Sequence, residues 1–193
     1  MNLDPWEQAE SAYFGASLAA LAAGNAGAAY AADISVASHL DALTAFLRTP
    51  SPVRPLHDRL ALLWASSKQR EALSDAGRKS LVTEVFAKQQ PDGGWTNESL
   101  GPWTSHPEAP VFSGSSSYAT AFTTYVLQRS GVKPSDPRLA RALLWLTGHQ
   151  NRETGAWPAL SMNKRYPAGS MQSFFMQDAA TAFASLALIE AGR

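Results

Sequence analysis

The chain has 193 residues, 16 basic and 16 acidic side chains, and no cysteine. This length fits a single domain over residues 1–193 with a sizeable core, and the lack of cysteine excludes disulfides, thiolate zinc sites and thiol nucleophiles. The balanced charge lacks the clustered Lys and Arg that mark nucleic-acid or anionic-membrane binding, so we expect neither partner.

Residues 11–32 carry no charge and must be tested as a membrane span or a signal peptide. They are rich in Ala and Gly, and so less apolar than a Leu-rich span. The preceding charges are acidic, at Asp4, Glu7 and Glu10, where a signal peptide has basic residues. We therefore expect a buried helix, no transmembrane segment and no signal peptide, which favours a cytoplasmic location.

Capping residues and apolar periodicity predict an all-α chain. Asp4 and Asp136 each precede a Pro, and Asp followed by Pro is typical of a helix start. Gly24, Gly131 and Gly192 each follow an apolar helical run, where a left-handed residue closes a helix. The seven predicted helices cover residues 5–23, 33–48, 55–68, 75–90, 116–130, 137–149 and 177–191.

The predicted helices alternate in character along the chain. The first, third, fifth and seventh contain uncharged segments whose apolar residues are not confined to one face, so we expect them to be buried on most sides. The others carry one-sided apolar stripes, such as Leu139, Leu143 and Leu146. This order is typical of stacked helical hairpins, with inner helices alternating with outer ones in a solenoid or ring.

A sequence repeat supports the hairpin arrangement. Residues 120–122 (Thr-Ala-Phe) recur 61 residues later as 181–183, and Gly131 recurs as Gly192 at the same offset. A third landmark, Gln-x-x-Gly-x-Trp, recurs with two extra residues. Its two copies comprise Gln90, Gly93 and Trp95, and Gln150, Gly155 and Trp157.

This third landmark resembles the QW motif of the squalene-hopene and oxidosqualene cyclases, and the segment 178–192 resembles the inner-helix half of the repeat that they share with protein prenyltransferases. The resemblance implies an α/α toroid, a ring of helical hairpins around a cavity that holds a polyisoprenoid. About seven helices form only part of such a ring. The ring is then either open or completed by another chain, such as a second copy.

The motif also has a direct physical interpretation as a structural clasp. Gln at the end of an outer helix can bond to unpaired backbone groups, Gly permits a sharp reversal, and Trp covers the turn with a broad apolar face. We therefore expect both copies to stabilise the fold.

Two long connections, 96–115 and 158–176, follow the two clasps, and loops of this length are often functional. In a toroid both would lie at one mouth of the cavity. Their aromatic residues, together with those at the start of the inner helix that follows each loop, are of a kind that binds an apolar ligand, although they could equally cap the core. The candidate ligand-binding residues are Trp103, His106, Phe112, Tyr118, Tyr166, Phe174 and Phe175.

The cyclase resemblance implies an Asp-rich acid motif, DxDD, at the start of an inner helix. Residues 177–180 occupy that place, but only Asp178 is acidic, and it falls on the variable position. Protonating an alkene needs crowded carboxyl groups, so cyclisation is not supported. Asp178 is the candidate catalytic residue, but we favour a helix cap for it, as for Ser117, which precedes it by one repeat.

We expect no metal and no cofactor. The resemblance to prenyltransferases implies a zinc site that includes Cys, and the chain has none. An alternative carboxylate–histidine site from His106, Glu108 and Asp178 has no recognisable ligand spacing. We interpret the other histidines as surface or packing residues, namely His39, His57 and His149.

The leading hypothesis is a squalene-hopene-cyclase-like repeat domain that binds an elongated, isoprenoid-like molecule. The missing Asp-rich motif argues against cyclisation, and any enzymatic activity would be of the terpenoid-cyclase type. A non-catalytic interaction scaffold that completes its ring with another chain is the alternative. A third hypothesis, a sugar-active or lyase-type α/α barrel, needs paired carboxylates in the cavity. Only Glu98, Glu108 and Asp178 are candidates for that pair.

Overall fold

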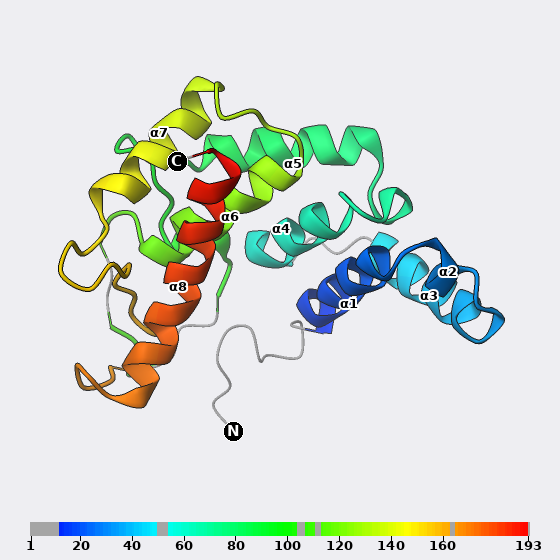
Figure 1. The fold of residues 1–193 in the computed structure, drawn as a ribbon, viewed down its shortest axis with the longest axis horizontal. Coiled ribbons are helices and arrows are strands. Elements are labelled where there is room, and N and C mark those ends of the chain that lie inside the picture. Colours follow the sequence, from blue (N-terminus) through cyan, green and yellow to red (C-terminus); the bar gives the residue numbers. More distant parts are fainter. Residues whose placement is uncertain (1–11, 50–53, 104–106, 111–112, 163–164, 193) are drawn as a thin grey trace.

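The computed structural model describes residues 12–49, 54–103, 107–110, 113–162 and 165–192, and these residues form helices and connections without a strand (Figure 1). The fold class predicted from the sequence, all-α, is confirmed. The helices are α1 (Ala12–Ala26), α2 (Ala28–Ala31), α3 (Ile34–Arg48), α4 (Leu56–Ala65), α5 (Asp75–Ala87), α6 (Ser117–Arg129), α7 (Pro137–Gly148) and α8 (Met171–Glu190), with short 3-10 turns η3 (Arg70–Ala72) and η4 (Glu98–Leu100).

Four of these helices form a series in which each packs on the next. Helix α1 packs on α4, α4 on α6, and α6 on α8. The other long helices flank the series, because α3 packs on α1, α5 on α4, and α7 on α6. Figure 1 shows α1 and α8 at the two ends of this series. We call α1, α4, α6 and α8 the inner helices.

Burial differs between the middle and the ends of the series. Most residues of α4 and α6 are buried, as predicted for inner helices. In α8, by contrast, only Ala180, Ala184 and Ala187 are buried, and α1 is buried on one side. The prediction that all four uncharged helices are buried on most sides is therefore wrong for α1 and α8, because each end helix has an inner neighbour on one side only.

Most predicted helix boundaries lie within a few residues of the observed ones. The predicted start at Asp136 is confirmed, since its side chain accepts a hydrogen bond from the Arg138 amide at 2.9 Å. Helix α8 begins at Met171, six residues before the predicted 177, with Ser170 as its N-cap. The short helix α2 was not predicted, and α1 continues through Gly24, where it was predicted to end, to Ala26. Residues 5–11 of the first predicted helix, including its proposed start, lie outside the described part of the chain.

Trp95 forms the centre of the first clasp and is fully buried. Its indole nitrogen donates to the carbonyl oxygen of Val85 near the end of α5 at 2.8 Å. Its backbone amide donates to the hydroxyl of Thr120 in α6 at 3.0 Å. One residue thus joins an outer helix to the next inner helix.

Trp157 repeats these contacts between α7 and α8. Its indole nitrogen donates to the carbonyl oxygen of Leu146 at 2.7 Å, and its amide donates to the hydroxyl of Thr181 at 3.0 Å. The side chain is 2% exposed. The sequence repeat therefore corresponds to a repeat of hydrogen bonds.

The glutamines align differently from the sequence motif. The side-chain amide of Gln150 donates to the carbonyl oxygen of Gly155 at 2.7 Å, and the side-chain amide of Gln89 donates to the carbonyl oxygen of Gly93 at 2.8 Å. The side chain of Gln90 instead bonds to a carbonyl oxygen two residues earlier. Gln89 rather than Gln90 therefore makes the bond equivalent to that of Gln150. Both glycines have positive φ, which permits the reversal.

Within the described residues, no helix is both long and apolar enough to cross a membrane, in agreement with the expectation from the sequence.

Candidate functional site

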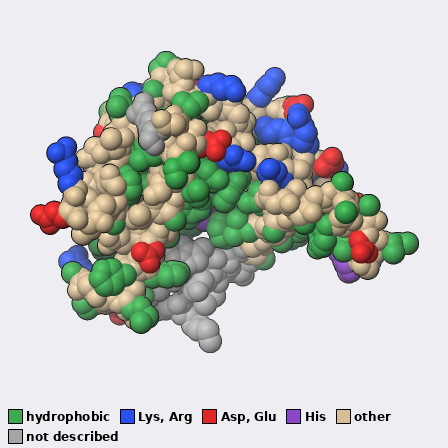
Figure 2. Space-filling view, in the orientation of Figure 1, with side chains coloured by type: hydrophobic (Ala, Val, Ile, Leu, Met, Phe, Trp, Pro, Cys, Tyr) green, Lys and Arg blue, Asp and Glu red, His purple; other side chains and the backbone are tan. Residues whose placement is uncertain are grey.

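An apolar pocket of about 200 Å³ lies among the four inner helices, and we call it the inner pocket. Each inner helix supplies one or more side chains, and two connecting segments complete the wall. The helices contribute Phe14 from α1, His57 from α4, Tyr118 from α6 and Phe175, Met176 and Ala179 from α8, and the connections contribute Asn97, Ala159, Leu160 and Met162. The space-filling view shows hydrophobic side chains around the hollow between α4 and α8 (Figure 2).

His57 forms part of the pocket wall and is only 2% exposed. Its ring lies 4.8 Å from that of Phe14 and 4.9 Å from that of Phe122, measured between centroids. The ring of Trp103 lies 5.7 Å away on a further side. His57 was expected to be a surface or packing residue. The structure places it in the core, where its two nitrogens need polar partners.

Both ring nitrogens of His57 have such partners. Nδ1 lies 3.2 Å from a carboxylate oxygen of Asp58, and Nε2 lies 2.9 Å from the phenol oxygen of Tyr118. Because an ionised carboxylate only accepts, we assign the proton to Nδ1. The Nε2 atom of a neutral ring then accepts from the Tyr118 hydroxyl. Asp58, His57 and Tyr118 thus form a hydrogen-bonded chain that ends at the inner pocket.

The pKa of Tyr118 is raised above its ordinary value of 10.0, first by burial and second by the negative charge of Asp58. Both effects disfavour the phenolate. Tyr118 therefore presents a neutral hydroxyl group at physiological pH.

A second, more polar pocket of about 300 Å³ adjoins the inner pocket and shares Asn97 and Tyr118 with it. Four serines from the segment 113–117 line it, together with the stacked rings of Trp145 and His149, whose centroids are 3.8 Å apart. These serines are Ser113, Ser115, Ser116 and Ser117. The inner pocket therefore borders a hydroxyl-rich region on one side.

Asp92 fixes the wall of this second pocket. Its carboxylate accepts from the Gly94 amide at 3.0 Å, the Ser115 hydroxyl at 2.8 Å and the Trp145 indole at 3.1 Å. Burial opposes ionisation of Asp92, but these hydrogen bonds outweigh it and lower the pKa. The carboxylate thus acts as a structural acceptor between the first clasp and α7.

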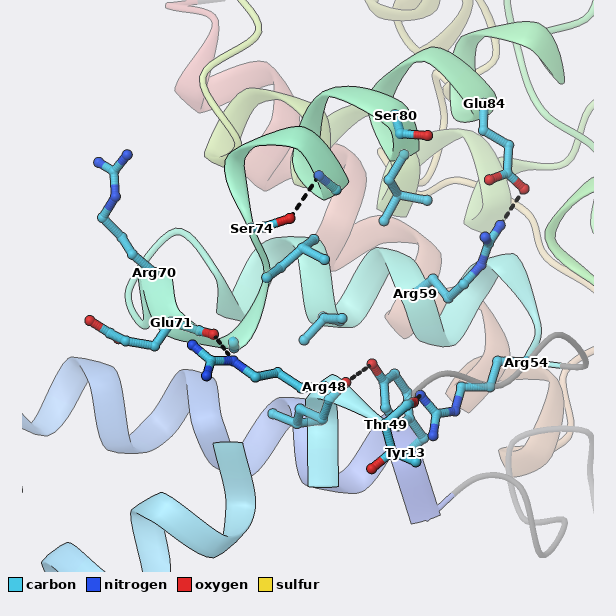
Figure 3. A pocket seen from close by; sticks show the side chains of 16 residues that line it. Tyr13, Arg48, Thr49, Arg54, Arg59, Arg70, Glu71, Ser74, Ser80 and Glu84 are labelled. Carbon is cyan, nitrogen blue, oxygen red and sulfur yellow. Dashed lines mark hydrogen bonds and ion pairs between the residues drawn. The ribbon is translucent and has the colours of Figure 1, made fainter. Parts of the chain in front are cut away.

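A third pocket, of about 580 Å³, lies between α3, α4 and α5 and contains several arginines (Figure 3). Arg59 pairs with Glu84, and Arg48 donates to the carbonyl oxygen of Glu71 at 2.6 Å. Arg54 donates to the carbonyl oxygen of Thr49 at 2.6 Å and lies over the ring of Tyr13. These bonds join neighbouring segments of the chain, so we interpret the arginines as structural.

The aromatic residues predicted to bind a ligand separate into several groups. Tyr118 and Phe175 line the inner pocket. Trp103 lies behind its wall, where its indole donates to the carbonyl oxygen of Asn97 at 2.7 Å. Phe174 is 53% exposed and Tyr166 is half-buried, and neither lines the inner pocket. The remaining two, His106 and Phe112, lie outside the described residues.

Asp178 is exposed in the interior of α8 and does not line the inner pocket. The prediction that it caps the helix is wrong, because Ser170 caps a helix that starts two turns earlier. Ser117 likewise is not the cap of α6, since the neighbouring Ser116 accepts from the Ala119 amide. Over the residues that the structure describes, no three His, Asp or Glu side chains cluster as metal ligands.

The structure brings together three polar residues that the sequence analysis did not propose for the site, namely His57, Asp58 and Asn97. One signal was present in the sequence. His57 and Asp58 begin a helix that is otherwise rich in Leu and Ala, and such polar residues are rarely buried without a partner.

No protein-family model matches the chain, and no curated protein matches it. The resemblance to the cyclase repeat therefore stays a prediction.

Proposed function

We propose that this chain is a terpenoid-cyclase-like segment of an α/α toroid and that it binds an elongated apolar molecule of the isoprenoid class. One observation carries the proposal. All four inner helices contribute side chains to a single pocket whose lining is mainly aromatic, aliphatic and thioether. Such a lining, with few polar groups, is typical of sites for apolar ligands.

The size of the inner pocket limits how much of a ligand it encloses. Its volume of about 200 Å³ is below the range of about 300–1,000 Å³ that is common for ligand pockets. At roughly 30 Å³ for each water-sized group, it holds about seven such groups, which is little more than one isoprene unit. The rest of an elongated molecule would lie along exposed apolar side chains at the pocket edge, Leu160 and Phe175.

We propose binding without cyclisation. Alkene protonation needs a strong acid in the pocket, and Asp178 is exposed and absent from the lining. The buried carboxylate nearby, Asp58, already accepts from His57. A paired-carboxylate mechanism has no support in the lining either, since no Glu or Asp is among the described residues that line the inner pocket.

A fluorescence titration with farnesene and squalene tests this function. Phe175→Ser removes an exposed aromatic ring at the pocket edge, and Leu144→Ser is a matched control on α7, where the side chain is 61% exposed and outside the pocket. We expect saturable binding by the wild type and about tenfold weaker binding by Phe175→Ser. No binding by the wild type, or equal weakening by both variants, would reject the proposal.

One observation favours the alternative function, an interaction scaffold. Helix α8 exposes a stripe of large apolar side chains on the side away from α6, at 84%, 67%, 41% and 71% of their area. This stripe consists of Met171, Phe175, Leu186 and Ile189. Exposed apolar faces of this kind are often covered by association.

Light scattering over a range of protein concentrations tests the scaffold. Association through α8 predicts a mass above that of one chain and a return to the monomer in the double variant Leu186→Ser/Ile189→Ser. A monomer at every concentration contradicts the alternative and leaves ligand binding as the function.

A further inference from the structure

We propose that the inner pocket recognises the hydroxyl group of an isoprenoid alcohol, through Tyr118 and Asn97, in preference to a hydrocarbon or a charged isoprenoid. This inference rests on the proposed function and specifies the chemistry of the ligand end that enters the pocket.

The first step is the unused hydrogen-bonding capacity of Tyr118. A phenol donates one hydrogen bond and can also accept. With His57 neutral, Tyr118 donates its proton to Nε2 over 2.9 Å, so its oxygen can still accept from a ligand. With His57 protonated, Nε2 donates to the phenol oxygen, and the hydroxyl proton is available instead. An alcohol both donates and accepts, so it is complementary to either state.

The second step is the side chain of Asn97, which lines the same pocket and is 5% exposed. The oxygen of its side-chain amide accepts from the Ser116 hydroxyl. Because the Ser116 oxygen already accepts from the Ala119 amide, its own proton is available for this bond, which sets the orientation of the Asn97 amide. Among the described residues, the amide nitrogen of Asn97 makes no hydrogen bond. This nitrogen is not among the fully buried side-chain atoms that lack a partner, so it is accessible from the pocket, and a ligand oxygen can accept a hydrogen bond from it.

The third step is charge. Among the residues that the structure describes, no Lys or Arg lines the inner pocket. Tyr118 is held neutral, and the nearest buried charge on its hydrogen-bonded chain is the carboxylate of Asp58. A carboxylate or diphosphate would enter an apolar site without a cationic partner, which strongly disfavours binding. A hydroxyl group carries no such penalty.

The test compares farnesol, farnesene and farnesyl diphosphate by fluorescence titration against the wild type, Tyr118→Phe and Asn97→Asp. Asn97→Asp keeps the acceptor for Ser116 and removes the amide donor. Tyr125→Phe is the matched control, because it makes the same substitution two turns later in α6 at a tyrosine outside the pocket. Circular dichroism and thermal unfolding check that every variant is folded.

Since one neutral hydrogen bond corresponds to about 3- to 10-fold in affinity, we expect the wild type and Tyr125→Phe to bind farnesol about tenfold or more tightly than farnesene, and both above the diphosphate. Tyr118→Phe and Asn97→Asp should each reduce the preference for farnesol by about 3- to 10-fold while farnesene binding persists.

Equal binding of farnesol and farnesene by the wild type, or an unchanged preference in both folded variants, overturns this inference alone. If Tyr118→Phe does not fold, the preference of Asn97→Asp for farnesol over farnesene alone decides whether the inference holds. Failure of all three compounds to bind rejects the proposed function itself.

Discussion

The indole nitrogen of Trp157 donates a hydrogen bond of 2.7 Å to the carbonyl oxygen of Leu146, near the end of α7. The last carbonyl groups of a helix lack partners within the helix, so this bond stabilises the helix end and also fixes the indole ring in the core. The Trp95 indole makes the equivalent bond at the end of α5.

Substitutions of Trp157 should separate its packing from its hydrogen bond. We expect Trp157→Ala to lower the free energy of unfolding by about 3–5 kcal/mol, because a buried aromatic side chain leaves a cavity. Trp157→Phe keeps most of the apolar area and should cost about 1–3 kcal/mol. Denaturant unfolding measures both, with Leu144→Ala as an exposed control expected within about 0.5 kcal/mol of the wild type.

The two clasp glycines should differ in their tolerance of alanine. Both have positive φ, which costs a non-glycine residue about 1–2 kcal/mol. A Cβ at Gly93 would also lie 2.9 Å from the backbone oxygen of Arg141, whereas a Cβ at Gly155 would have no neighbour closer than 4.0 Å. We therefore expect Gly93→Ala to be more destabilising than Gly155→Ala by at least about 1 kcal/mol. Equal losses in thermal or denaturant unfolding would show that α7 moves away from the first clasp at little cost.

Asp136 should make folding stability depend on pH in the acid range. Hydrogen bonds from Arg138 lower the pKa of Asp136 from 3.8 to about 2. The bond from the guanidinium has the largest effect, and the bond from the backbone amide has a smaller one. Because the folded pKa is the lower one, the stabilisation is complete above about pH 4 and is lost as the pH falls through about 2.

The variant Asp136→Asn isolates this contribution, because Asn retains the capping oxygen without the charge. We expect a loss of up to about 1 kcal/mol at neutral pH and almost none at pH 2, measured as the difference in unfolding free energy from the wild type. A constant difference across this range would contradict the assignment. The other aspartates with lowered pKa titrate equally in both proteins and cancel.

Tyr118 should titrate late in the alkaline range. Its pKa in the folded protein lies above the ordinary value of 10.0 because of burial and the charge of Asp58. A raised folded pKa gives stability that is present below pH 10 and decreases at higher pH. Burial also raises the pKa of Tyr13, so ultraviolet absorbance of the folded wild type should show a late phase to which both phenols contribute. Tyr118→Phe should reduce this phase by the absorbance of one phenol. Ionisation of every phenol near pH 10 in the folded protein, or an unchanged late phase in Tyr118→Phe, would contradict the raised pKa of Tyr118.

The sequence was sufficient to predict the all-α class, most helix boundaries and the two clasps, because these depend on local signals. Asp136 before a proline, and apolar runs followed by Gly131 and Gly192, report on the backbone directly. The repeat was also visible in the sequence, because the repeated residues have the same structural role. Thr120 and Thr181 accept equivalent hydrogen bonds from the backbone amides of the two clasp tryptophans.

The remaining features depend on contacts between distant segments. The pairing of His57 with Tyr118 joins residues 61 positions apart, and nothing in the local sequence of either residue specifies it. The start of α8 was placed too late because aligning the repeat on Thr181 put Asp178 at the helix start, whereas the apolar residues before it continue the helix. The clasp glutamine was assigned to Gln90 from motif spacing, although Gln89 reaches across the turn.

The serial packing of α1, α4, α6 and α8 makes the fold modular. In the described part of the chain, each of these helices packs mainly on its neighbours in the series, and such nearest-neighbour packing does not by itself set the total number of units. Gain or loss of a hairpin beyond α1 or α8 would leave the register of the interior helices unchanged. Under the proposed function it would lengthen or shorten the wall available to an apolar ligand, so the extent of the proposed binding surface would change in steps of one hairpin.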